Sequence, residues 1–93
     1  MDQIDKKQRV EQLFQLIAGI DDPEDIKVLF EDLCTYKEVE QMAQRVKAAR
    51  LLIEGKTYSK VIEETDISSA TLSRVSRCVQ YGGGYSKFLT QKN

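Results

Sequence analysis

The sequence has no histidine and only two cysteines among its 93 residues. Histidine is the commonest general base and the commonest metal ligand in proteins, so its absence removes both roles from this chain. Cys34 and Cys78 lie far apart in the sequence and cannot by themselves form a cysteine-rich zinc site. We therefore expect no enzyme, no metal and no cofactor, with carboxylate or lysine chemistry as the remaining enzymatic alternative.

A long apolar run and a secretory signal are also missing. No hydrophobic stretch approaches the length that spans a bilayer. Residues 1–10 lack the apolar centre of a signal peptide. Both cysteines fall in expected helices beside apolar residues, which favours reduced, buried thiols. We expect a cytoplasmic protein with no membrane partner.

Charge is distributed unevenly along the chain, although the formal net charge is only −1. Residues 1–41 hold eleven acidic side chains against five basic ones, whereas residues 42–78 hold seven basic side chains against four acidic ones. An acidic N-terminal part followed by a basic part is consistent with a domain in which the basic part faces DNA. The overall acidity predicts weak non-specific affinity for DNA.

Helical periodicity and capping residues predict three helices in the first half of this single, small domain. The first covers residues 5–19, and its wide apolar stripe either docks on its own domain or is shared with a second chain. Asp22 and Pro23 mark the start of the second, because aspartate caps a helix and proline fits its first position. Thr35 and Glu38 form a capping-box pattern that opens the third and longest helix.

Residues 57–81 have the pattern of two short helices joined by a tight turn. Asp66 falls at the turn, where a left-handed backbone that aspartate tolerates is often needed. Ile67 fills the corner, and the hydroxyl of Ser68 is placed to cap the second helix. Helical spacing predicts that one face of each helix points inward. The inward positions are Val61, Ile62 and Thr65 in the first helix, and Leu72, Val75 and Val79 in the second.

The outer face of the second helix carries small and basic side chains and no acidic one. A helix that enters the DNA major groove needs small polar residues near its N-terminus to approach base edges, and cations further along for phosphates. The pattern predicts a helix-turn-helix that binds DNA. The alternative is a protein–protein interaction module without DNA binding, because paired amphipathic helices occur there too. The outward residues are Ser69, Ala70, Thr71, Ser73, Arg74 and Arg77.

Three glycines follow at residues 82–84. A phosphate-binding loop would need a lysine and a serine or threonine at fixed spacing after them, and these are absent. We interpret the glycines as a helix terminator and hinge. Tyr85, Phe88 and Leu89 then predict a last short helix that docks on the domain.

A series of short motifs extends from residue 33 to residue 81 and covers more than half of the chain. They are Leu33, Thr35 and Glu38 at a helix start, Arg45-Val46, Leu51-Leu52, Gly55 and Ala70-Thr71-Leu72-Ser73-Arg74. This combination is far more specific than any one motif, and it resembles the Trp repressor superfamily. Residues 77–82 are similar to the Trp-repressor-related branch called YerC/YecD.

The resemblance implies an all-α, intertwined homodimer with five to six short helices per chain, which binds operator DNA and represses transcription in bacteria. It divides the domain into N-terminal helices for dimerisation (1–34), a long central helix (35–56), the helix-turn-helix (57–81) and a glycine hinge with a C-terminal tail (82–93). A dimer presents two recognition helices about one DNA turn apart, so the double-stranded operator should be near-palindromic. The resemblance assigns base contacts to Lys60, Ser69, Ala70 and Ser73, and a phosphate contact to Thr71.

The family's corepressor pocket carries over only in part. Arg45 and Arg74 match the two arginines that flank the indole of tryptophan, and Thr35 matches a threonine at the pocket. Val75 stands where the family has glycine, and Cys78 stands where it has a serine near the ligand's ammonium group. The valine would occupy the indole slot, and a thiol is the poorer hydrogen-bond partner. We therefore expect a vestigial or altered effector pocket.

We predict that L-tryptophan does not switch this protein. Val75 adds an isopropyl group to a close-packed site, and overpacking typically costs about 1–3 kcal/mol. This cost lowers the affinity roughly tenfold to more than a hundredfold. Calorimetric titration with L-tryptophan should therefore show no saturable binding at micromolar ligand. Saturable binding accompanied by tighter DNA binding would show that the pocket admits the indole.

Overall fold

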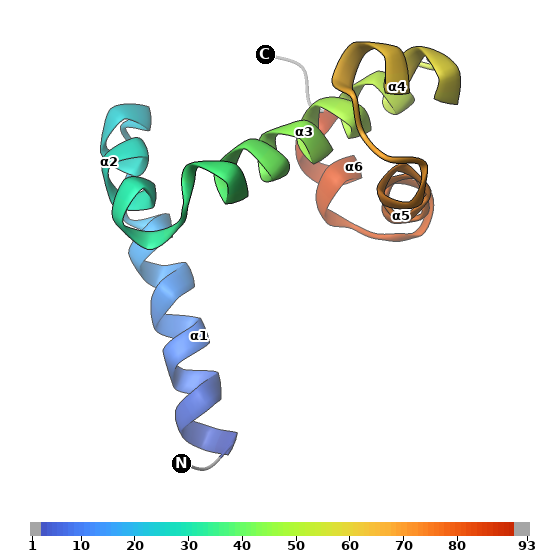
Figure 1. The fold of residues 1–93 in the computed structure, drawn as a ribbon. Helices are drawn as coiled ribbons and strands as arrows, with labels where there is room; N and C mark the ends of the chain where they lie inside the picture. Colours follow the sequence, from blue (N-terminus) through green and yellow to red (C-terminus); the bar gives the residue numbers. More distant parts are fainter. Residues whose placement is uncertain (1–2, 91–93) are drawn as a thin grey trace. The chain divides into compact units, whose positions relative to one another are not determined.

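The computed structural model describes residues 3–90, which form six α-helices and no strand (Figure 1). In chain order these are α1 (Gln3–Ala18), α2 (Pro23–Leu33), α3 (Tyr36–Ile53), α4 (Tyr58–Thr65), α5 (Ser69–Tyr81) and α6 (Gly84–Leu89). The predicted all-α class is confirmed, while the end of the predicted C-terminal tail, residues 91–93, lies outside the described residues. The chain divides into two compact units, the first ending at Tyr36 and the second beginning at Lys37.

Local capping explains where α2 begins. Asp22 has an extended backbone, and its carboxylate accepts the N–H of Glu24 at 3.0 Å. Pro23 follows as the first helical residue, where its missing N–H costs nothing. Glu24 and Asp25 then place negative charge at the positive end of the helix. The predicted aspartate–proline start is confirmed, and α3 likewise begins directly after Thr35.

The N-terminal unit leaves its apolar side chains accessible. Among its described side chains, residues 5–36, none is buried. Large apolar side chains that stay exposed are available to bind another surface. The large apolar side chains exposed there are Val10, Phe14, Leu16, Val28, Leu33 and Tyr36.

The core of the C-terminal unit combines side chains of α3, α4, α5 and the turn before α5. Ala48 and Ala49 contribute two fully buried small side chains from α3 to this core. Tyr85 and Leu89 of α6 pack against this core and are half-buried. The buried apolar side chains are Ala48, Ala49, Leu51, Val61, Ile67, Leu72 and Val75.

Two side chains depart from the sequence pattern. Ile62 remains 37% exposed, because the fully buried Val61 takes the inner position and adjacent residues of a helix point in different directions. Phe88 is exposed as well, since Tyr85 and Leu89 provide the face of α6 that packs on the core. The Nζ atom of Lys87 lies 5.3 Å from the centre of the Phe88 ring. The predictions that Ile62 faces inward and that Phe88 docks are therefore wrong.

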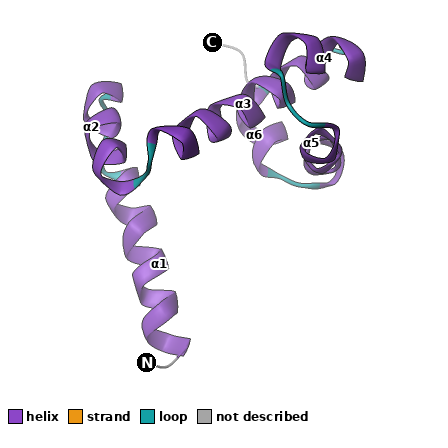
Figure 2. Cartoon of the chain, viewed as in Figure 1, coloured by secondary structure: helices purple, strands orange, loops and turns teal. Residues whose placement is uncertain are grey.

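The link between α5 and α6 depends on Gly82. Figure 2 shows this link and the turn at residues 66–68 as the loops that separate the last three helices. The N–H of Gly82 donates to the carbonyl oxygen of Cys78 at 2.9 Å. A Cβ atom at position 82 would lie 2.7 Å from that oxygen, whereas one at Gly83 or Gly84 would meet no atom within 4 Å. The glycines terminate the helix as predicted. Among them, only at Gly82 would a side chain collide with neighbouring atoms.

We predict opposite effects for two alanine substitutions in this link. Gly82→Ala should lower the free energy of unfolding by about 1–3 kcal/mol, because the backbone carbonyl of Cys78 must move to admit the new methyl group. Gly84→Ala is the matched control and should be neutral or slightly stabilising, because it places alanine in open space at the first residue of α6. Urea denaturation of both variants measures the difference, and equal midpoints would contradict the steric argument.

Candidate nucleic-acid interface

The turn between α4 and α5 is short and held at both ends. Thr57 caps α4, since its hydroxyl oxygen accepts the N–H of Lys60 at 3.2 Å. Asp66 caps the end of α4; its φ of 61° lies in the left-handed region, and its N–H donates to the carbonyl of Ile62 at 2.8 Å. Ile67 follows and is buried. The left-handed turn predicted at Asp66 and the corner predicted at Ile67 are confirmed.

Ser68 starts the second helix of the motif. Its backbone is extended, and its hydroxyl oxygen accepts the N–H of Thr71 at 3.2 Å. The same hydroxyl donates to Oγ1 of Thr71 at 2.9 Å. The predicted cap is confirmed. Thr71 is half-buried, and its N–H and its hydroxyl are both hydrogen-bonded to Ser68. It therefore differs from its exposed neighbours on the predicted DNA surface.

α5 has one buried face and one exposed face. Leu72 and Val75 are buried and Val79 is half-buried, as helical spacing predicts. Figure 1 views α5 nearly along its axis, beside α4, which lies across the view. The structure brings five of the predicted DNA-contact residues together on the exposed face of this helix. They are Ser69, Ala70, Ser73, Arg74 and Arg77.

The exposed face of α5 is basic, and no carboxylate of the same helix opposes its charge. It carries Arg74 and Arg77, and α5 contains no acidic residue. Neither arginine forms an ion pair with any of residues 3–90. Unpaired cations on an exposed surface are available to neutralise phosphates and release their counterions.

Lys60 on α4 has a different electrostatic environment. Its Nζ atom lies 3.4 Å from Oε1 of Glu63 and 3.9 Å from Oε2 of Glu64, one turn further along the helix. All three side chains are accessible, and exposed pairs of this kind contribute about 0–1 kcal/mol. Lys60 is therefore accessible to DNA, but two neighbouring carboxylates offset its charge.

A hollow of about 380 Å³ lies at the C-terminal end of this face. Arg74, Arg77, Cys78, Tyr81 and Gly82 line it. Tyr81 is 81% exposed and was missed by the sequence analysis, although its position four residues after Arg77 places it on the same side of the helix. The hollow joins two cations to an aromatic ring, and it contains no carboxylate.

Only two residues of the predicted effector pocket meet in this hollow. Arg74 and Cys78 line it, whereas Arg45 lies half-buried on α3 and does not. Val75 is 1% exposed and belongs to the apolar core. Thr35 lies in the N-terminal unit, and the other four residues lie in the C-terminal unit. The position that would have to admit a ligand is thus filled by a packed side chain.

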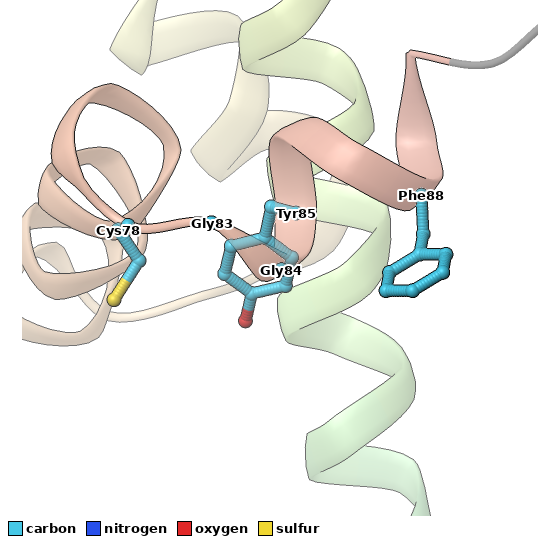
Figure 3. A pocket seen from close by; sticks show the side chains of 6 residues that line it. Cys78, Gly83, Gly84, Tyr85 and Phe88 are labelled. Atoms are coloured by element: carbon cyan, nitrogen blue, oxygen red, sulfur yellow. The ribbon is translucent and has the colours of Figure 1, made fainter.

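A second hollow of about 340 Å³ lies where α5 meets α6 (Figure 3). Cys78 contributes its side chain from the last turn of α5, and Tyr85 and Phe88 contribute theirs from α6. The glycines of residues 82–84 provide the backbone between them. No charged side chain lines this hollow, so it offers no cation to a phosphate or a carboxylate.

Two further properties concern the described residues as a whole. They contain no group of three or more histidine, cysteine, aspartate or glutamate side chains that could hold a metal ion. None of the helices within residues 3–90 has both the length and the apolar composition of a membrane span.

The fold and the exposed face of α5 define a helix-turn-helix protein. The family model described as Trp repressor protein matches residues 8–93. The uncharacterized protein YerC of Bacillus subtilis (strain 168) is 48% identical over 82 residues, which are 86% of this chain and 79% of YerC. The chain belongs to the Trp repressor protein family, whose fold is that of DNA-binding helix-turn-helix regulators.

Solved structures are similar over most of the chain. A Staphylococcus aureus crystal structure of a candidate Trp repressor has a TM-score of 0.82 and 34% identity, over 92% of this chain and 89% of that chain. The structure of a TrpR-like protein from Eubacterium eligens ATCC 27750 has a TM-score of 0.81 and 44% identity, over 85% of this chain and 82% of that chain. The family resemblance inferred from the motifs is confirmed.

We predict that the arginines and the serines of α5 affect DNA binding in different ways. Arg74→Ala and Arg77→Ala should each reduce the slope of log affinity against log salt by about one for each phosphate that the protein no longer neutralises. Ser69→Ala combined with Ser73→Ala should leave that slope unchanged and alter the preferred sequence, because we expect these side chains to reach base edges.

Fluorescence anisotropy at several salt concentrations measures the slope for each variant. Lys27→Ala on α2 removes a cation outside α5 and is the control for net charge. An unchanged preferred sequence after both serines are replaced would place base readout elsewhere on the protein.

Proposed function

We propose that this protein is a homodimeric, sequence-specific transcriptional repressor of the bacterial cytoplasm, which reads its operator with α5 and does not respond to tryptophan. The observation that carries the proposal is the exposed face of α5. Small side chains occupy its first turn, and two arginines without ion pairs among the described residues follow further along. This order matches what major-groove entry requires.

The small residues allow the helix to come close to the bases. Ser69 and Ala70 are exposed in the first turn of α5, and Ser73 is exposed one turn later. A serine hydroxyl both donates and accepts hydrogen bonds, and an alanine methyl contacts the methyl group of thymine. Lys60 adds a base contact from α4, and Thr71 adds a phosphate contact near the cap.

The homodimer would use the apolar side chains of residues 1–34. Phe14 and Val28 are more than half exposed, and burying such a side chain contributes roughly 1.5–3 kcal/mol. Two chains joined in this way present two copies of α5, so each operator half-site is read once. The same exposed side chains also favour the competing function, binding of another protein without DNA, but that function does not explain the unpaired arginines of α5.

Independence from tryptophan is supported by the packing of Val75. Its side chain lies in the core with Val61 and Leu72, which fastens α5 to the rest of the unit without a ligand. Cys78 offers a thiol where a hydroxyl would bind a ligand more strongly. Arg45 and Arg74 of the C-terminal unit and Thr35 of the N-terminal unit match the family's pocket residues, and we expect any effector to be a ligand other than tryptophan.

The decisive experiment is selection of bound sequences from a random pool of double-stranded DNA. We expect enrichment of near-palindromic sites whose half-sites are about one helical turn apart. Binding of the selected site should survive at salt concentrations that abolish binding to mixed genomic fragments, because base contacts do not depend on counterion release. A pool that stays unenriched after repeated rounds would contradict the proposal.

The Arg74→Ala, Arg77→Ala double variant is the matched control, and it should enrich nothing under the same conditions. Sedimentation equilibrium at micromolar concentration tests the assembly independently. It should give twice the chain mass of 10.7 kDa. A mass of one chain would contradict the homodimer and leave the competing interaction module as the better explanation.

A further inference from the structure

We infer that Gln44 is a positioning residue, which holds the turn of the helix-turn-helix from α3 so that α5 keeps its direction without a bound ligand. The inference rests on the proposed function, because it concerns how the DNA-reading helix is oriented. Gln44 lies on α3, outside the residues that would touch DNA.

The side-chain amide of Gln44 donates from Nε2 to the main-chain carbonyl oxygen of Thr65 at 3.0 Å. Thr65 is the last residue of α4, and the last carbonyls of a helix have no partner within it. The two residues are 21 positions apart in the sequence, so this bond connects α3 to the end of α4. Both residues are half-buried, which limits replacement of the bond by water.

The hydroxyl of Thr65 holds the other side of the turn. It donates to the carbonyl oxygen of Val61 at 2.7 Å and accepts the N–H of Ile67 at 3.3 Å. Asp66 lies between these attachments and is the one non-glycine residue with positive φ among residues 3–90. Thr65 thus forms hydrogen bonds on both sides of Asp66, whose own N–H donates to the carbonyl of Ile62, and Gln44 anchors Thr65 to α3.

Gln44 contributes a hydrogen bond where its neighbours on the same row of α3 contribute apolar packing. Gln44 lies four residues before Ala48 and seven before Leu51, so it continues the row of α3 that packs into the core. Apolar packing stabilises without a preferred direction, whereas a hydrogen bond has a preferred distance and angle. The row therefore holds α4 and α5 against α3, and Gln44 adds the directional contact at its end.

The position of α5 follows directly from this anchor, because Ser69 starts the helix three residues after Asp66. Hydrogen bonds to bases weaken steeply when distance or angle changes, so a small rotation of α5 removes the hydrogen bonds of Ser69 and Ser73. Long arginine side chains can adapt to the same rotation and so retain their contacts with phosphates. Removal of the Gln44 bond should therefore reduce sequence discrimination more than salt-dependent binding.

The test is Gln44→Met, which keeps the length of the side chain and removes the donor. A hollow of about 340 Å³ beside Gln44 and Thr65 leaves room for the thioether without overpacking. The ratio of affinities for the selected site and for random DNA should fall about tenfold, as expected when one hydrogen bond is removed at each of two reading helices. The salt slope should stay unchanged, and backbone amides of residues 67–69 should exchange faster with solvent.

Gln41→Met is the matched control, because Gln41 is exposed on the same helix one turn earlier. It should keep the affinity ratio of the unaltered protein. Gln44→Lys restores a donor that reaches the Thr65 carbonyl, and it should recover part of the ratio. A purely structural role would lower the unfolding temperature of Gln44→Met without changing the ratio.

Two outcomes separate this inference from the proposed function. Selection of one site by the unaltered protein, retained in full by Gln44→Met, overturns the positioning role alone. Failure of the unaltered protein to select any site overturns the proposed function, and this inference with it.

Discussion

The left-handed backbone at Asp66 is the constraint on which the candidate interface on α5 depends. It ends α4 after Thr65 and redirects the chain before α5 begins at Ser69. This change of direction allows Val61 of α4 to share a core with Leu72 and Val75 of α5. The buried faces of the two helices then leave the opposite face of α5 exposed, so the site is a consequence of the turn.

The two units of the chain differ in how much apolar surface they bury. The C-terminal unit surrounds a core that includes the fully buried Ala48 and Leu72, whereas no described side chain of the N-terminal unit is buried. Since burial of apolar area is the main favourable term in folding, the N-terminal unit gains little of it within the described chain. The proposed homodimer would supply the missing burial, and it would couple folding of that unit to protein concentration.

Position 75 connects the core to regulation. A small residue there leaves space between helices, and a valine fills that space with packed side-chain atoms. The packed valine holds α5 against the core, and the hydrogen bond from Gln44 to Thr65 would, in the role proposed above, act toward the same result from α3. A regulator whose reading helix is already held in place would not be controlled by a ligand that orders this helix. Its activity would have to be controlled in another way.

Local features of this protein could be predicted from its sequence. The caps at Asp22 and Ser68 and the left-handed turn at Asp66 depend on hydrogen bonds and backbone preferences within about four residues, which a sequence displays directly. The exposed face of α5 follows from helical periodicity for the same reason. By contrast, only the tertiary structure decided that Val61 is buried while Ile62 is exposed, and that Gln44 meets Thr65. These contacts join residues on different helices, and their geometry depends on the angles at which the helices pack, which no local pattern specifies.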